Sequence, residues 1–153
     1  MKYALYPGCA AQGATPELYQ STRAIIGRLG IEVVELAASS CCGAGVVGEA
    51  DPDIQVALNA RTFAQAEQLG LDVMTICGTC QGVMSAANKR LKQEAELLHR
   101  INRVLAKDGP TYHGKVQVKH LLWIVVKEVG LARLGREIRI PMQDFRIAPF
   151  YGC

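Results

Sequence analysis

The sequence lacks the features that would place it in a membrane or on nucleic acid. Its longest apolar stretch, residues 121–126, is far shorter than the ~20 residues that span a bilayer. No basic-then-apolar signal peptide follows Met1, so we expect a cytoplasmic protein. The net charge is only +3 and the basic residues are spread along the chain, which argues against a nucleic-acid surface.

Composition and length favour one folded domain. The chain has 153 residues, of which 50% are hydrophobic, enough to fill a core. Neither a linker nor a low-complexity tract divides it, so we predict a single domain over residues 1–153. Residues 3–9 and 147–153 are similar and both end in Gly-Cys, so Cys153 would be the first cysteine of a second motif. We therefore expect this domain to be the first of a tandem pair, with a second motif that begins at about 146–153 and is cut off.

Apolar patterns along the chain predict alternating strands and helices. Short aliphatic runs predict strands at residues 2–6, 31–36, 71–76 and 146–150. Helical periodicity predicts helices at residues 16–29, 52–69, 81–107 and 116–129. Strands that alternate with helices are typical of an α/β fold. We expect a Rossmann-like, largely parallel sheet flanked by helices.

The six cysteines are the unusual feature of this composition. In a reducing compartment, clustered cysteines indicate metal or redox chemistry more often than disulfides. Five of them follow predicted strands: Cys9, Cys41, Cys42, Cys77 and Cys80. Because ligands bind outside the carboxyl ends of parallel strands, we expect these five sulfurs to meet at one edge of the sheet.

Thiolates are soft ligands that bind zinc, copper(I) and iron–sulfur clusters. A zinc site or a ferredoxin-type cubane uses four of them, so five leave one extra sulfur or indicate a larger cluster. Gly43 and Gly45 free the intervening loop of side chains, so that its N–H groups can face sulfides. Cys77 and Cys80 lie at a predicted helix N-terminus, where the helix dipole favours thiolate.

Two other interpretations use the same residues. The run Gly43-Ala-Gly45-Val-Val-Gly48 matches the dinucleotide-binding pattern, but it follows the second predicted strand, and Glu67 is expected within a helix. The pair Cys77-x-x-Cys80 after a strand matches a thioredoxin-like dithiol site, which would work without metal. A structural zinc site is a further alternative.

The spacing of the five cysteines resembles a known family. The pattern is Cys9, then Cys41-Cys42-Gly43, then Cys77-x-x-Cys80, with 31 residues (10–40) between Cys9 and Cys41 and 34 (43–76) between Cys42 and Cys77. It is similar to the CCG motif of the cysteine-rich domain in the B subunit of heterodisulfide reductase. Relatives of that protein include the E subunit of some succinate dehydrogenases and the iron–sulfur subunits of glycolate- and lactate-oxidising complexes.

The resemblance implies a cofactor and partners. The five cysteines would bind a noncubane [4Fe-4S] cluster, although zinc is assigned to one motif in some relatives. The chain would be an electron-transfer or disulfide-reducing oxidoreductase subunit, incomplete without a second CCG half. Electrons would come from a flavin or ferredoxin-like partner and pass to a disulfide or a quinone-type acceptor, with any membrane association made through partners. The resemblance also places a histidine of interest at His120.

Overall fold

The computed structural model describes residues 1–107, 109–140 and 143–148. Its centre is a parallel sheet with the strand order β2-β1-β3-β4. These strands are β1 (Lys2–Tyr6), β2 (Glu32–Glu35), β3 (Val73–Thr75) and β4 (Val118–His120). The predicted Rossmann-like α/β fold with a parallel sheet is confirmed.

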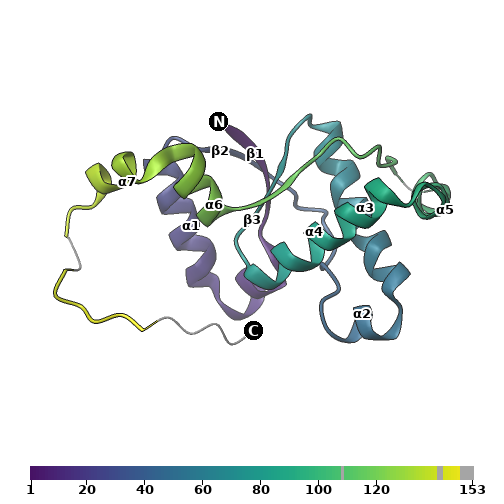
Figure 1. The fold of residues 1–153 in the computed structure, drawn as a ribbon, viewed down its shortest axis with the longest axis horizontal. Helices are drawn as coiled ribbons and strands as arrows, with labels where there is room; N and C mark the ends of the chain where they lie inside the picture. The colour runs from purple at the N-terminus through teal and green to yellow at the C-terminus, as the bar shows by residue number, and fades with distance from the viewer. Residues whose placement is uncertain (108, 141–142, 149–153) are drawn as a thin grey trace.

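Helices cover both faces of the sheet (Figure 1). One face packs against α1 (Pro16–Arg28) and the C-terminal series α6 (Leu121–Ile124), η2 (Val125–Gly130) and α7 (Leu131–Glu137). The other face packs against α3 (Pro52–Gln68), α4 (Gly78–Gln93) and α5 (Ala95–Leu105). Two short helices, η1 (Ala10–Ala14) and α2 (Val46–Ala50), follow β1 and β2.

Alternation along β1 divides the interior into two cores. Tyr3 and Leu5 point into the core shared with α1 and α6, whereas Ala4 and Tyr6 point into the core shared with α3 and α4. Successive side chains of a strand face opposite sides of its sheet. Because both sides of β1 are buried, its sequence is apolar or aromatic throughout the buried part, as in central strands of parallel sheets.

The prediction of one helix over residues 116–129 is wrong in its first part. Residues 118–120 form β4, which pairs with β3 through Val73 and Val118. This strand is only three residues long, Val-Lys-His, which is too short for periodicity to separate a strand from a helix. The available edge of β3 decides the outcome, because the N–H of Val73 donates to the carbonyl of Gln117. The helix begins only at Leu121.

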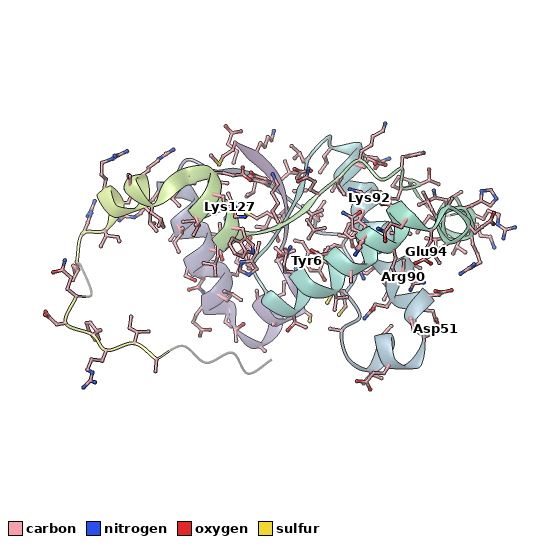
Figure 2. All side chains as sticks on the ribbon, viewed as in Figure 1. Tyr6, Asp51, Arg90, Lys92, Glu94 and Lys127 are labelled. Atoms are coloured by element: carbon pink, nitrogen blue, oxygen red, sulfur yellow. The ribbon has the colours of Figure 1, made fainter. Side chains whose placement is uncertain are left out.

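The predicted helix over residues 81–107 is two helices. It begins earlier, at Gly78, and the chain leaves helical geometry at Glu94 (φ −110°, ψ 85°) before α5 starts. A continuous helix over that range would be about 40 Å long, at 1.5 Å per residue, and would overshoot the short sheet. The turn lets Leu97 and Ile101 of α5 pack into the core beside α3. Arg90 and Glu94 form an ion pair across the break (Figure 2).

The predicted strand at residues 146–150 is not found where the structure describes it. Residues 146–148 have no regular secondary structure, and Ile147 is exposed. Residues 149–150, and with them most of the second motif at 147–153, lie outside the described residues. The prediction of a second motif there, and of Cys153 as its first cysteine, stays a prediction.

Candidate metal centre

The cysteines surround the topological switch point of the sheet. From β1 the chain crosses to β2 on one side, and from β3 it crosses to β4 on the other. Ligands of open α/β sheets bind in the crevice between such a pair of strands, at their carboxyl ends. Cys9 comes three residues after β1, and Cys77 comes two after β3. Cys41 and Cys42 approach the same crevice from the loop after β2.

The five thiols form a row of neighbours. Cys9 lies beside Cys41 and Cys41 beside Cys42. The sulfurs of Cys42 and Cys80 are 3.5 Å apart, and Cys77 completes the row next to Cys80. Cys42 and Cys80 are buried, whereas Cys9 and Cys41 are exposed. The row therefore runs from the surface at Cys9, through the interior at Cys42 and Cys80, to the half-buried Cys77.

All five cysteines are free thiols. Among the residues that the structure describes, no three His, Cys, Asp or Glu side chains are arranged to hold a single metal ion. The sulfurs are adjacent in pairs and follow the line of the crevice. Cys153 lies outside the described residues.

A hydrogen bond between Cys42 and Cys80 shifts the pKa values of both buried thiols in opposite directions. The hydrogen bond between the Cys42 and Cys80 sulfurs lowers the pKa of Cys42. The same hydrogen bond, together with burial, raises the pKa of Cys80. Within this pair the hydrogen bond favours the thiolate at Cys42. The prediction that the α4 N-terminus favours thiolate at Cys77 and Cys80 stays a prediction. A buried thiolate of this kind is a ready metal ligand.

Glycines let the cysteine-bearing segments approach one another. Gly8 has φ +75°, and a Cβ there would lie 3.4 Å from the Cys80 sulfur. Gly43 also has φ +75°, and its N–H donates to the Cys41 sulfur over 3.4 Å. A side chain at either position would crowd the sulfurs or strain the backbone. Soft thiols, an open backbone and inward N–H groups fit an iron–sulfur cluster, whose sulfides accept such hydrogen bonds.

Tyr6 is a site residue to which the sequence assigns no role. Its ring is buried between the sheet and the helices (Figure 2). Burial raises the pKa of its phenol, and so does the nearby negative charge of Cys80, Cys42, Cys41 and Cys9. The hydroxyl therefore stays protonated and donates to the Ser40 carbonyl, at 3.0 Å. The signal in the sequence is its position, as the last strand residue before Pro7-Gly8-Cys9.

A groove adjoins the row of cysteines at Cys77. It has a volume of about 350 Å³ and is lined by Gly78, Gln81, His120, Leu122, Trp123 and Val126. Leu122 and Trp123 are 66% and 56% exposed, which is unusual for large apolar side chains. His120 caps α6, since its Nδ1 accepts from the N–H of Leu122 at 3.1 Å. Burial lowers the pKa of His120, so the neutral ring needed for this cap is favoured.

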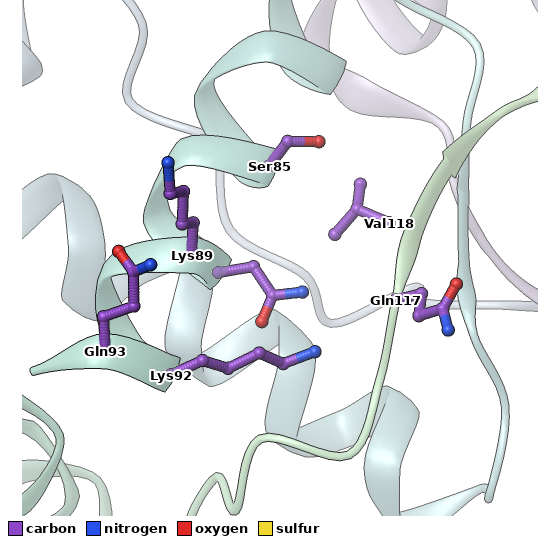
Figure 3. Close-up of a pocket in the computed structure, with 7 residues that line it drawn as sticks. Ser85, Lys89, Lys92, Gln93, Gln117 and Val118 are labelled. Carbon is purple, nitrogen blue, oxygen red and sulfur yellow. The ribbon is translucent and has the colours of Figure 1, made fainter. Parts of the chain in front are cut away.

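A second hollow, of about 360 Å³, lies along α4 beside β4 (Figure 3). Lys89 and Lys92 line it, but the Lys92 ammonium already donates to the Val116 carbonyl at 2.8 Å. None of the five cysteines of the row lines this hollow. We therefore assign it no part in the site.

The dinucleotide interpretation does not fit the structure. The run Gly43–Gly48 follows β2 and leads into α2, which is only five residues long. Glu67 lies within α3 and accepts hydrogen bonds from the backbone of His113 and Lys115. The first βα turn, which should hold a pyrophosphate, contains Cys9 instead.

The fold and the site together define a parallel α/β domain with thiols gathered at its switch point. Residues 3–85 match the cysteine-rich domain family called CCG, a segment that contains all five cysteines. The chain belongs to this family.

Curated proteins of similar sequence cover the whole chain. It is 33% identical, over 100% of its length, to a protein of Archaeoglobus profundus named as like the B subunit of heterodisulfide reductase. It is 36% identical to the 8-methylmenaquinol:fumarate reductase membrane anchor subunit of Wolinella succinogenes over 99%. It is 32% identical, again over 99%, to the B subunit of the ferredoxin/F420H2-dependent CoB-CoM heterodisulfide reductase of Methanosarcina acetivorans. The chain spans about half the length of these relatives, at 51–52%.

A solved structure supports the fold. The chain resembles a crystal structure of a hypothetical protein from Helicobacter pylori with a TM-score of 0.71 at 18% identity. The similarity covers 82% of this chain and 25% of the other. Within the described residues, no helix is both long and apolar enough to cross a membrane.

Proposed function

We propose that the chain is the cluster-binding part of a redox protein related to the B subunit of heterodisulfide reductase. Membership of the CCG family and the names of its relatives support a role in a multi-subunit reductase. The observation that supports this most directly is the row of five thiols at the switch point of the sheet. Neither a zinc site nor a cubane needs five sulfurs, so the proposed cofactor is a noncubane [4Fe-4S] cluster.

The ligands in this proposal are Cys9, Cys41, Cys42, Cys77 and Cys80. When bound, the cluster would supply one-electron transfer to a disulfide or a quinone-type acceptor. The chain itself supplies thiolates, shields the buried end from water and directs N–H groups toward sulfur. Burial and hydrogen bonds of this kind adjust the reduction potential of a cluster.

The proposal includes a second half and electron-transfer partners. The relatives are about twice as long as this chain, which supports one domain of a tandem pair. Leu122, Trp123 and Val126 expose an apolar face beside Cys77, where a second CCG half or a partner protein would cover it. A flavin or ferredoxin-like donor is the proposed electron source. One relative is named a membrane anchor subunit, which supports association with a membrane through partners.

The test is the metal and sulfide content of protein purified without oxygen. We expect about four irons and four sulfides per chain and a brown chromophore. Serine at any one of the five proposed ligands should lower the iron content or change the EPR spectrum. Cys153→Ser is the matched control and should change neither. One zinc ion without colour would overturn the redox assignment and leave a structural zinc module.

A further inference from the structure

Side chains from other parts of the chain donate hydrogen bonds to the carbonyl groups of the loop that bears Cys41 and Cys42. We call residues 38–45 the cysteine loop. Its carbonyls at Ala38, Ser40, Cys42 and Gly43 each accept a side-chain hydrogen bond. Exposed loops more often leave such groups to water. Here four peptide groups in six residues are fixed by the protein itself.

The donors come from one face of α3 and from the end of β1. Asn59 Nδ2 donates to the Cys42 carbonyl at 2.9 Å, and Gln55 Nε2 donates to the Gly43 carbonyl at 2.9 Å. These two residues are one helical turn apart, so both side chains face the loop. The Tyr6 hydroxyl donates to Ser40. Arg61 donates to Ala38 at 3.2 Å and Gln65 donates there at 3.3 Å.

The N–H groups of the same loop face the sulfurs. The Gly43 N–H donates to the Cys41 sulfur, and the Ala44 N–H lies near enough to the Cys42 thiol to lower its pKa. The positive φ angles of Gly43 and Gly45 allow successive N–H groups to turn inward. Each peptide dipole is therefore oriented by a donor on its carbonyl side. The result is a concave set of N–H groups at the position of negative charge.

Asn59 is buried although its side-chain oxygen lacks a hydrogen bond from the described residues. The side chain is 1% exposed, and its Oδ1 has no hydrogen-bond partner among the described residues, whereas Nδ2 donates to both the Cys42 and Gln55 carbonyls. A buried acceptor without a partner destabilises the fold, and each such group needs an explanation. Holding the Cys42 peptide provides one.

Gly48 keeps the second donor in place. A Cβ at Gly48 would lie 2.2 Å from Gln55 Nε2, so any other residue would displace the carboxamide from the Gly43 carbonyl. Gly48 lies in α2, and its φ is not positive. Backbone conformation therefore does not explain the glycine. Space for Gln55 does.

We propose that Asn59, Gln55 and Tyr6 are positioning residues that orient the cysteine loop so that its N–H groups face the bound sulfur ligands. The part of this inference that concerns the cluster rests on the function proposed above. The oriented N–H groups stabilise negative charge, so they favour the reduced, more negative state of a cluster. Loss of a carbonyl anchor lets the peptide turn and lowers the reduction potential.

The experiment compares Asn59→Ala with Asn88→Ala. Asn88 is a buried asparagine on α4 that donates to the Val116 carbonyl and not to the cysteine loop. Amide hydrogen exchange of residues 41–45 is measured in the metal-free protein by mass spectrometry. Asn59→Ala should raise exchange there about tenfold, the loss of one net hydrogen bond. Asn88→Ala should leave it unchanged relative to exchange at β1. Equal exchange at 41–45 in wild type and Asn59→Ala would overturn the proposal.

A second pair of variants, each of which removes only a hydroxyl group, keeps the proposal testable if the alanine variants misfold. Tyr6→Phe removes only the hydroxyl that reaches Ser40, and Tyr112→Phe removes a buried hydroxyl that bonds Asn88 instead. In the protein reconstituted with iron and sulfide, Tyr6→Phe and Asn59→Ala should lower the reduction potential and speed the loss of iron to a chelator. Tyr112→Phe should change neither. An unchanged potential in both site variants would overturn the electrostatic part of the inference.

The two proposals fail in different ways. If wild-type protein takes up no cluster but Asn59→Ala still loosens residues 41–45, the function is wrong and the loop inference is supported. If the cluster forms and all variants match wild type in exchange and potential, the loop inference is wrong and the function is supported.

Discussion

Two buried tyrosine–asparagine sets, whose asparagines lie on the neighbouring helices α4 and α3, show that similar residues can have different roles. In the first set, the Tyr112 hydroxyl donates to Asn88 Oδ1 at 2.5 Å, and Asn88 Nδ2 donates to the Val116 carbonyl. In the second set, Tyr6 and Asn59 are not bonded to each other. Each reaches a separate carbonyl of the cysteine loop.

The two sets differ in how completely the polar atoms of the asparagine side chain are hydrogen-bonded. Both polar atoms of the Asn88 side chain have a partner, so this set is a closed network that joins α4 to the segment before β4. In the part of the chain that the structure describes, the Asn59 Oδ1 has no partner. Fully paired buried networks rigidify a fold, whereas partly paired ones are inferior to apolar packing. We infer that the first set contributes to stability and the second to the shape of the site.

The largest expected change in the free energy of unfolding comes from a substitution that breaks the closed network. Asn88→Ala leaves the buried Tyr112 hydroxyl without its acceptor, whereas the Val116 carbonyl still accepts from Lys92, so the free energy of unfolding should fall by about 2 kcal/mol. Asn59→Ala also frees the Cys42 carbonyl, but it removes an acceptor that was already unpaired, so its loss should be only about 1 kcal/mol. Urea denaturation of the metal-free variants measures both. A larger loss in Asn59→Ala than in Asn88→Ala would contradict the comparison.

The sequence predicts the gathering of the five cysteines better than it predicts the elements around them. Strands followed by cysteines are enough to place five sulfurs at one edge, because the carboxyl ends of parallel strands share that edge. The parallel pairing of the first three strands also follows from their long crossovers. What the pattern could not give is the break at Glu94 or β4, since both depend on where neighbouring elements end.

The supports of the site are harder to find from sequence. Asn59 is flanked in α3 by the apolar Val56, Ala60 and Phe63, all buried. A polar residue in an apolar stripe is a signal that something buried needs a donor. Its partner, the Cys42 carbonyl, belongs to a loop 17 residues earlier. No local pattern encodes that pairing, so only the folded structure reveals it.

A pair of glycine variants should give an intermediate change in the free energy of unfolding. It separates the effect of helix propensity from that of the Gln55 hydrogen bond to the cysteine loop. Gly82 lies in α4, where an added Cβ would meet nothing within 4 Å, so Gly82→Ala should raise the free energy of unfolding by up to about 1 kcal/mol. Gly48→Ala gains the same propensity but displaces Gln55, so the net change should be near zero. Hydrogen exchange at Gly43 and Ala44 should rise only in Gly48→Ala. Equal stabilisation in both variants would show that Gln55 adds nothing to the loop.

The smallest expected effect concerns His120, a polar side chain near the cysteines that supports a helix and not the loop. Its neutral Nδ1 caps the N-terminus of α6. His120→Ala should lower the free energy of unfolding by about 0.5–1 kcal/mol, as for other caps. It should leave exchange at residues 41–45 unchanged. Faster exchange there would mean that the α6 end and the cysteine loop form one unit.

The cap should also make stability depend on pH. Burial lowers the pKa of His120 below its ordinary value of 6.5, so on acidification the unfolded chain takes up a proton before the folded one. The contribution of His120 is therefore complete above pH 6.5 and is lost as pH falls through the folded pKa. His120→Gln should flatten the decline in unfolding free energy below pH 6.5, with the exposed His99→Gln on α5 as the control. An identical decline in wild type and His120→Gln would place the acid sensitivity elsewhere and leave the cap with a purely geometric role.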